Sequence, residues 1–339
     1  MNDFDVVDFV LPWVDGSDQK WIEDYNKWAF EAKKPGADSR TERFRDYGLL
    51  KYVFRGIEKF TPWVRTVHFV TNGQKPEWLN LSCSKLHFVR HEDYISKQYL
   101  PVFSSHPIEL CMHKISGLAE KFVYLNDDFF FIAPIPKSFF FNKGLPCDYT
   151  GFTTLGISST KIPHILLNDY IEINKHFSRR DVLKSHFFKW YNLMNGPNLV
   201  KTLCTSPFRR IDGIIARHFP QPYTKSCLED VWNNCSDVLN ETVSHRFRNQ
   251  LTDVNQWLFR FWNLCKGNFH PKNCYKYEHF LRISEIKDSD IAKIKNQKYR
   301  VICINDDLDE IVCINPENKM QQILSALEII LPEKSSFEL

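Results

Sequence analysis

Short apolar segments alternate with amphipathic ones over the first part of the chain. Residues 5–14 and 121–125 are rich in Val and Phe and end at polar residues, a pattern typical of buried strands. Residues 41–60 repeat apolar side chains at helical spacing, with Thr41 as the expected N-cap and Pro62 as the stop. The other elements predicted here are strands at 64–70 and 86–90 and a helix at 106–119.

This alternation predicts an α/β fold with a mostly parallel, doubly wound sheet. In such sheets, ligands bind beyond the carboxyl ends of the strands. Polar groups follow three of the predicted strands, at residues 15–18, 71–73 and 126–128. We therefore expect the functional site at this edge of the sheet.

The second half is predicted to be mainly helical. Helices are expected at 181–194, at 254–265, where Gly267 ends the apolar stripe, and at 317–330 behind Asn315-Pro316. Strands are expected near 300–304 and 311–314. Residues 142–160, rich in Gly, Thr and Ser, are expected to form a flexible, lid-like connection. This pattern divides the chain into an α/β core at 1–141, an insertion at 142–200, and a helical segment at 201–339 that returns to the core.

Composition narrows the class of protein. The 339 residues include 44 basic and 41 acidic side chains, and a net charge of +3 argues against nucleic-acid binding as the main role. No apolar run approaches the length of a transmembrane helix, and the N-terminus does not resemble a signal peptide. The ten cysteines form no CxxC pair, so we expect reduced thiols in a cytoplasmic protein.

The first candidate site is the turn after the first strand. Asp15 and Asp18 can accept hydrogen bonds from a ribose or a base, and Gly16 allows the backbone to approach a ligand closely. A simple hydrophilic turn is the alternative, because turns favour the same residue types.

The second candidate is Asn126-Asp127-Asp128. Two acids between the apolar runs 122–125 and 129–132 are costly unless they are solvated, paired or bound to a metal. Carboxylates at a strand end suit Mg²⁺ or Mn²⁺ bridging a diphosphate. The alternative is a β-turn with an Asx contact.

Two further groups contain titratable side chains. Glu109 and His113 are four residues apart, so on a helix they share a face that could point into the same crevice as Asp128, although an ordinary surface pair is the alternative. His218 could act as a base or a nucleophile, and the arginine fork of Arg248 could hold phosphate oxygens. A structural histidine is the alternative, and the sequence alone does not place His218 beside Asp128.

Taken together, these residues resemble the Stealth family of capsular polysaccharide phosphotransferases. That family also includes the catalytic subunits of the animal lysosomal-enzyme N-acetylglucosamine-1-phosphotransferase. The similarity covers nearly the whole chain through four blocks in the family's order: DVVDFVLPWVDGSD at 5–18; residues 43–80 continuing through 100–131; HFPQPYTKSCLEDVW at 218–232 with TVSHRFR at 242–248; and VICINDD at 301–307 with SSFEL at 335–339.

The resemblance implies a glycosyltransferase-A-like nucleotide-sugar fold with a large helical addition. It implies a UDP-sugar donor, Mg²⁺ or Mn²⁺, and release of UMP. It implies catalytic roles for Glu109, Asp128, His218 and Arg248, and we expect Asp127, Asp128 and Glu109 as metal ligands. With the residues discussed above, the expected substrate-binding set is Trp13, Asp15, Gly16, Asp18, Arg43, Asp46, Asn72, Gly73, Gln74, His106, His113 and Asn126. Residues 142–200 match the family weakly, so we expect acceptor specificity there.

The hypothesis is transfer of a sugar-1-phosphate from a UDP-sugar to a glycan hydroxyl, which forms a phosphodiester in a capsular or cell-surface polysaccharide. His218 is the preferred base, and a phosphohistidine intermediate is the alternative. A conventional glycosyltransferase that releases UDP, and a non-catalytic carbohydrate-binding module, are rival interpretations. The sequence leaves open whether the acceptor is lipid-linked, whether the protein touches the inner face of a membrane, and its oligomeric state.

Overall fold

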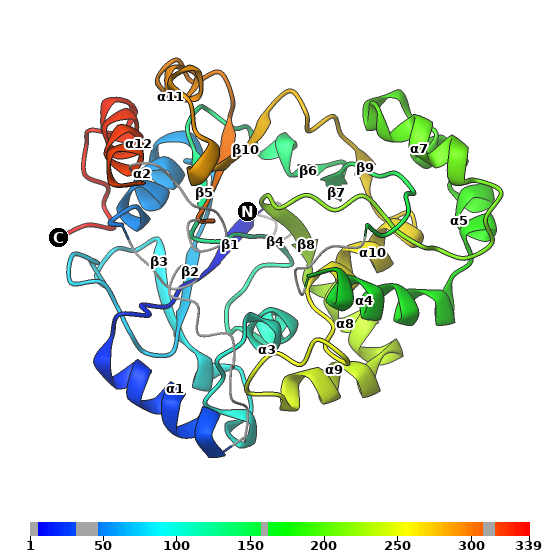
Figure 1. Ribbon diagram of the computed structural model, residues 1–339, viewed down its shortest axis with the longest axis horizontal. Helices are drawn as coiled ribbons and strands as arrows, with labels where there is room; N and C mark the ends of the chain where they lie inside the picture. The colour runs from blue at the N-terminus through cyan, green and yellow to red at the C-terminus, as the bar shows by residue number, and fades with distance from the viewer. Residues whose placement is uncertain (1–5, 32–46, 157–161, 308–315) are drawn as a thin grey trace.

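The apolar segments of the first half form the central sheet of a mixed α/β protein (Figure 1). The computed structural model describes residues 6–31, 47–156, 162–307 and 316–339. The central sheet has the strand order β3-β2-β1-β4-β8, in which the first four strands are parallel and β8 is antiparallel to β4. The strands predicted near 5–14, 64–70, 86–90 and 121–125 are confirmed as β1 (Val7–Pro12), β2 (Val67–Thr71), β3 (Leu86–Arg90) and β4 (Lys121–Tyr124), and β8 is Gln221–Thr224.

Both faces of this sheet are covered, which is why its strands β1, β2 and β4 are mostly apolar. Alternate side chains point to opposite faces, so Phe9 and Val123 enter one hydrophobic core while Val10 and Phe122 enter the other. Helices α2 (Leu50–Phe60) and α12 (Pro316–Ile330) contribute to the first core. Helices α3 (Ser105–Cys111), α4 (Ile162–His176), α8 (Lys225–Asn234), α9 (Ser236–Ser244) and α10 (Trp257–Cys265) contribute to the second.

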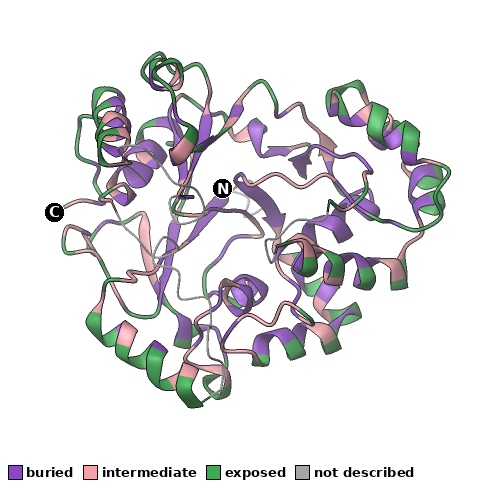
Figure 2. Cartoon of the chain, viewed as in Figure 1, coloured by how far each residue is buried: buried purple, intermediate pink, exposed green. Residues whose placement is uncertain are grey.

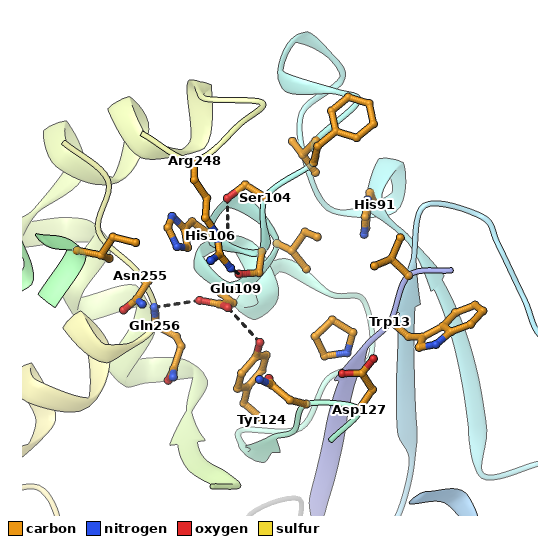
Figure 3. Close-up of a pocket in the computed structure, with 18 of the residues that line it drawn as sticks. Trp13, His91, Ser104, His106, Glu109, Tyr124, Asp127, Arg248, Asn255 and Gln256 are labelled. Carbon is orange, nitrogen blue, oxygen red and sulfur yellow. Dashed lines mark hydrogen bonds between the residues drawn. The ribbon is translucent and has the colours of Figure 1, made fainter. Parts of the chain in front are cut away.

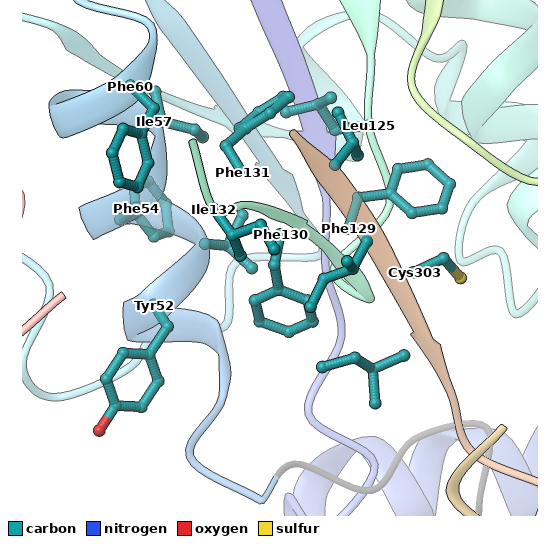
Figure 4. Close-up of a cluster of buried hydrophobic side chains, with 14 of the residues drawn as sticks. Tyr52, Phe54, Ile57, Phe60, Leu125, Phe129, Phe130, Phe131, Ile132 and Cys303 are labelled. Atoms are coloured by element: carbon teal, nitrogen blue, oxygen red, sulfur yellow. The ribbon is translucent and has the colours of Figure 1, made fainter. Parts of the chain in front are cut away.

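A second sheet continues directly from the acidic turn. Strand β5 (Phe129–Phe131) pairs with β11 (Val301–Asn305), which also pairs with β10 (Glu278–Arg282). Strand β5 lies beside α2 (Figure 4), and burial of each of its three phenylalanine rings stabilises the fold by about 1.5–3 kcal/mol. Gly56 of α2 permits this approach, because a Cβ there would lie 2.5 Å from the carbonyl oxygen of Phe131. The acidic turn is therefore fixed at both ends by buried strands.

The prediction of a flexible connection at 142–160 is wrong for its first part. Strand β7 (Leu145–Asp148) joins β6 (Phe141–Asn142) and β9 (His270–Pro271) in a third sheet. Thr150 and Phe152 are fully buried behind it. Buried contacts outweigh the loop-like composition of this segment; residues 157–161 lie outside the described part of the chain.

Several helices differ from their predicted lengths. Helix α2 starts at Leu50 rather than near 41, because residues 47–49 are not helical and Gly48 adopts a φ of +74°. The helix predicted at 106–119 ends at Cys111 and continues only as a 3₁₀ turn, Met112–Lys114. The helix predicted at 181–194 is divided into α5 (Arg179–Ser185), α6 (Phe187–Trp190) and a 3₁₀ turn (Leu193–Asn195).

The remaining predictions for the second half were closer. The final helix is confirmed as α12, the strand near 300–304 as β11, and the amphipathic stripe at 254–265 as α10. Thr41 and the strand predicted at 311–314 lie outside the described residues. The helices not predicted are α1 (Gln19–Glu31), α4, α7 (Asn198–Thr205), α8, α9 and α11 (Asp288–Lys295). Across the described ranges, no helix combines the length and the apolar character that a membrane span requires.

Candidate active site

A cleft of about 310 Å³ opens at the carboxyl edge of the central sheet (Figure 3). The residues that follow the four parallel strands line it: Trp13 after β1, Asn72 after β2, His91 after β3, and Asn126 with Asp127 after β4. The cleft therefore opens at the edge of the sheet where the sequence analysis expects the site. In Figure 3, Trp13, His91 and Asp127 face Glu109, Arg248 and Gln256 across the cleft.

His218 reaches this edge because β8 runs antiparallel to β4. Gln221, the first residue of β8, pairs with Tyr124, the last residue of β4. The residues just before β8 therefore lie where β4 ends. His218 Nε2 is 3.1 Å from Asp128 Oδ2 and 3.3 Å from Asn126 Nδ2. The predicted meeting of the sheet's acidic turn with the helical half is thus present in the structure.

The carboxylate of Asp128 controls the charge of His218. Burial opposes protonation of the imidazole, but the attraction and hydrogen bond of Asp128, with smaller contributions from Glu109 and Asp127, raise the pKa of His218 above its ordinary value. The side chain stays 40% exposed, so a substrate can reach it. This arrangement suits a residue that accepts a proton and then has its positive charge stabilised.

Asp128 also belongs to a cluster that the sequence did not suggest. Its Oδ2 accepts a hydrogen bond from the Cys303 thiol at 3.3 Å, and burial together with Asp128 raises the pKa of that thiol. Within the described chain, the side-chain atoms of Asp128, His218 and Cys303 that could ligate a metal ion lie within 4.8 Å of one another. The expected trio of Asp127, Asp128 and Glu109 does not form a comparable group there.

Glu109 is held apart from Asp128 by its own hydrogen bonds. Its Oε1 accepts from the Tyr124 hydroxyl at 3.1 Å, and its Oε2 accepts from the Gln256 backbone N–H at 3.3 Å. Ser104 caps α3, the helix that carries Glu109, by accepting from the His106 backbone N–H. Glu109 thus joins α3, β4 and the start of α10 at the wall of the cleft.

The segment between α9 and α10, which carries Arg248, is held by a buried carboxylate. Asp253 accepts hydrogen bonds from His106 Nδ1 at 3.0 Å, His245 Nδ1 at 2.7 Å and the Asn249 backbone at 2.8 Å. Burial opposes the charge of Asp253, but the two histidines hold its pKa below the usual range. Arg248 donates to the Ser105 hydroxyl at 3.0 Å and lines the cleft together with His106.

His106 is kept neutral beside this arginine. Burial lowers its pKa, and the charge of Arg248 lowers it further, while Asp253 acts in the opposite direction. Because an ionised carboxylate only accepts hydrogen bonds, the imidazole proton lies on Nδ1. His106 Nε2 therefore remains a hydrogen-bond acceptor.

The turn after β1 divides into two parts. Trp13 lines the cleft and stacks on Phe69, with ring centroids 5.7 Å apart. Asp15 Oδ1 accepts from the Ser17 backbone and hydroxyl, and Asp18 caps α1 by accepting from the Trp21 backbone at 2.7 Å. Both carboxylates therefore shape the turn, as in the alternative given in the sequence analysis, and neither lines the cleft.

The loop after β2 braces this turn. The Gln74 side chain exchanges two hydrogen bonds with the backbone of Asp15, at 3.0 and 2.9 Å, and Gly73 supplies a φ of +110°. Like Gly16, these two residues lie outside the cleft lining, which takes only Asn72 from this loop. Arg43 and Asp46 lie outside the described residues.

The placement predicted for His113 is wrong. Helix α3 ends at Cys111, so the i, i+4 spacing from Glu109 no longer places both side chains on one face. His113 instead packs on Trp232, with ring centroids 5.8 Å apart, and it does not line the cleft.

Other cleft residues were not predicted. His91 directly follows β3, so the rule that located Asn72 and Asn126 would have found it. Tyr124 lies inside an apolar strand, and Asn255 with Gln256 precede a helix, where no local pattern marks them as functional.

The buried histidines give a prediction for stability against pH. Burial lowers the pKa of both His91 and His113 from 6.5 to about 4, so between these values the unfolded chain binds protons that the folded chain does not. The free energy of unfolding should therefore fall as the pH drops from 6.5 toward 4, by on the order of 2 kcal/mol per histidine. Urea denaturation at several pH values measures this slope. The slope should be shallower in His113→Gln, and an unchanged slope in that variant would contradict the assignment.

Two family models match the N-terminal part of the chain. The family model described as Stealth protein CR1, conserved region 1, matches residues 5–30, and that of Stealth protein CR2, conserved region 2, matches residues 43–147. These regions include the ends of β1, β2 and β4, and Glu109.

Three relatives match over nearly their whole length. The chain is 37% identical over 338 residues to a capsular polysaccharide phosphotransferase, WcwK, of Streptococcus pneumoniae, covering 100% of this chain and 99% of the relative. It is 36% identical to the receptor polysaccharide phosphotransferase WefC of Streptococcus gordonii, over 98% of this chain and 99% of the relative. It is 35% identical to the exopolysaccharide phosphotransferase cps2G of Lactiplantibacillus plantarum, over 98% of this chain and 96% of the relative.

Proposed function

Because the chain belongs to the Stealth family, we propose that it transfers a sugar-1-phosphate from a UDP-sugar to a hydroxyl of an acceptor glycan. The observation that carries this proposal is the contact of 3.1 Å between Asp128 and His218, which lines the cleft together with Arg248. A proton acceptor, a carboxylate and an arginine around one cleft are the groups that phosphoryl transfer requires. The product is a phosphodiester in a capsular or exopolysaccharide, as the names of the relatives suggest.

The carboxyl ends of the parallel strands offer a site for the donor in this proposal. The uridine and pyrophosphate lie across the carboxyl edge of β1, β2 and β4, where Trp13 offers a ring and Asn72 and Asn126 offer amides. The central sheet then serves as a nucleotide-sugar core of the glycosyltransferase-A kind. Arg248 lines the opposite wall, where its guanidinium would hold phosphate oxygens of the donor.

A divalent cation fits the acidic turn. Asp128 Oδ1 is buried without a hydrogen-bond partner in the described part of the chain, and Asp127 is exposed and lines the cleft. Mg²⁺ is commonly held by one or two carboxylates together with substrate phosphates, and this turn supplies two. When bound there, Mg²⁺ or Mn²⁺ would neutralise charge on the pyrophosphate and the departing nucleotide.

The protein's own groups then perform the transfer. His218 removes the proton from the acceptor hydroxyl, and the Asp128 carboxylate stabilises the imidazolium that forms. The hydroxyl oxygen bonds to the phosphorus that carries the donor sugar, and the bond from that phosphorus to the bridging oxygen breaks, so UMP leaves. The sugar C1–O bond is untouched, and the anomeric configuration is therefore retained. A covalent adduct on His218, trapped with UDP-sugar in the absence of acceptor, would instead make His218 the nucleophile.

Replacing Arg248 should lower the catalytic rate much more than the stability of the fold. Its guanidinium is aimed at charge on the transferred phosphate, so Arg248→Ala should lower kcat/KM by about 10²-fold. Arg248→Lys keeps the charge but loses the planar fork, so it should recover only part of the rate. Initial-rate kinetics on both variants measure this effect. Equal rates in wild type and Arg248→Ala would remove the arginine from the mechanism.

Removal of the divalent cation should stop turnover. Because the negative charges of Asp127 and Asp128 would repel a pyrophosphate unless a cation lay between them, EDTA should lower the rate at least about tenfold. Adding back Mg²⁺ or Mn²⁺ should restore it, and Asp127→Asn should raise the Mg²⁺ concentration that gives half-maximal rate. Full activity after exhaustive chelation would exclude the cation.

Phosphorus NMR of the glycan product tests the proposed function. We expect a phosphodiester resonance in the polysaccharide made from UDP-sugar and acceptor. A product free of phosphorus would instead assign the protein to the conventional glycosyltransferases.

A further inference from the structure

Exposed apolar side chains concentrate in one short stretch far from the sheet. Of the 17 large apolar side chains exposed within the described ranges, seven lie between residues 187 and 208. Phe188 is 85% exposed, Leu193 84% and Val200 62%. They sit on α6, the following 3₁₀ turn and α7, at the periphery of the molecule beside α5 (Figures 1 and 2). Soluble proteins rarely leave such a group in water without a partner.

The segment that contains this stretch carries an excess of positive charge. Residues 180–210 contain six Lys or Arg (180, 184, 189, 201, 209, 210) and one acid, Asp181, which gives 6 − 1 = +5. The whole chain has a net charge of only +3, so the other residues sum to 3 − 5 = −2. None of the six basic side chains is buried. We call residues 180–210 the α5–α7 surface.

We propose that the α5–α7 surface docks on a membrane leaflet that contains anionic lipid. Exposed Phe and Leu side chains enter the headgroup boundary, and Lys and Arg contact the lipid phosphates, each basic residue contributing about 1 kcal/mol near such a membrane. A symmetric contact between two copies would bring two surfaces of +5 charge together, which opposes self-association. Charge complementarity therefore favours the lipid surface as the occupant.

Helix α4 connects this surface with the cleft. Ile162 at its first turn lines the cleft, and its 15 residues extend for about 22 Å before the chain enters α5. Two exposed residues of α4, Leu167 and Ile171, line a surface hollow together with Arg210. A docked α5–α7 surface would thus hold the cleft near glycans carried on the membrane. This last step rests on the proposed function, whereas the docking itself does not.

Vesicle flotation with the full chain, without substrates, tests the docking. We expect wild type to float with vesicles of phosphatidylcholine and phosphatidylglycerol but not with phosphatidylcholine alone. Phe188→Ser combined with Leu193→Ser should lower the bound fraction at least about fivefold, and so should Arg209→Glu combined with Arg210→Glu. Phe30→Ser is the matched control, because Phe30 is 87% exposed on α1, away from this surface, and its loss should leave binding unchanged.

The outcomes separate this proposal from the catalytic one. UDP binding, measured by calorimetry on the same variants, should persist, because none of the altered residues lines the cleft. No flotation of wild type with anionic vesicles would overturn the docking, as would variants that float like wild type. A wild-type dimer that Phe188→Ser with Leu193→Ser dissociates, with no vesicle binding, would assign the surface to a second copy and also overturn it.

Discussion

Replacing Asp128 with Asn should lower the rate of sugar-1-phosphate transfer by about 10³-fold while leaving the fold intact. The substitution keeps the volume of the side chain but removes the charge that raises the pKa of His218 and that would hold a cation. His218→Ala should cause a loss of similar size, because the proton acceptor itself is then absent. Initial rates at saturating UDP-sugar, together with thermal unfolding, measure both effects.

The double variant distinguishes a shared role from two separate ones. If Asp128 and His218 act as a unit, the double variant should lose little more than either single variant. Asp230→Asn serves as the control, because Asp230 is also paired, with Lys266, but lies on α8 outside the cleft. Near-normal rates in either single variant would show that this pair does not carry the chemistry.

Replacing Asp148 with Ala should destabilise the protein by about 3–5 kcal/mol. Asp148 on β7 forms two hydrogen bonds with the fully buried Arg260 of α10, at 2.8 and 3.1 Å. The substitution would leave a buried guanidinium without its counter-charge. Urea unfolding measures the change in free energy of unfolding.

Two further variants distinguish the cost of an unpaired buried charge from the cost of losing any ion pair. Asp148→Leu combined with Arg260→Met should recover much of the loss, because both charges are then absent. Glu92→Ala removes an exposed partner of Arg90 and should cost less than about 1 kcal/mol. If Asp148→Ala were no more costly than Glu92→Ala, this pair would not anchor the third sheet.

The parts of the fold that could be predicted are those in which the local pattern of apolar residues agrees with the burial of the segment. Strands β1, β2 and β4 are mostly apolar and buried, and each ends at polar residues, so their positions and the edge where the cleft opens follow from the sequence. Helix α2 began later than predicted, because its apolar periodicity extended beyond the point where Gly48 turns the chain.

The parts that could not be predicted depend on contacts between distant residues. The short strand β8, with Pro222 inside it, gives no strong strand signal, yet its pairing with β4 places His218 beside Asp128. Asp253 organises His106 and His245 across 147 and 8 residues of sequence, and no spacing rule connects them. Asp15 and Asp18 show the converse, because residues suited to a ligand are used to shape a turn and to cap α1.

The nucleotide released during turnover tests the central claim most directly. With a UDP-sugar and an acceptor glycan, chromatography of the wild-type reaction should give UMP in step with acceptor consumed, and His218→Ala should give almost none. Release of UDP in the same proportion would mean that the acceptor attacks the sugar carbon rather than the phosphorus, and would contradict the account.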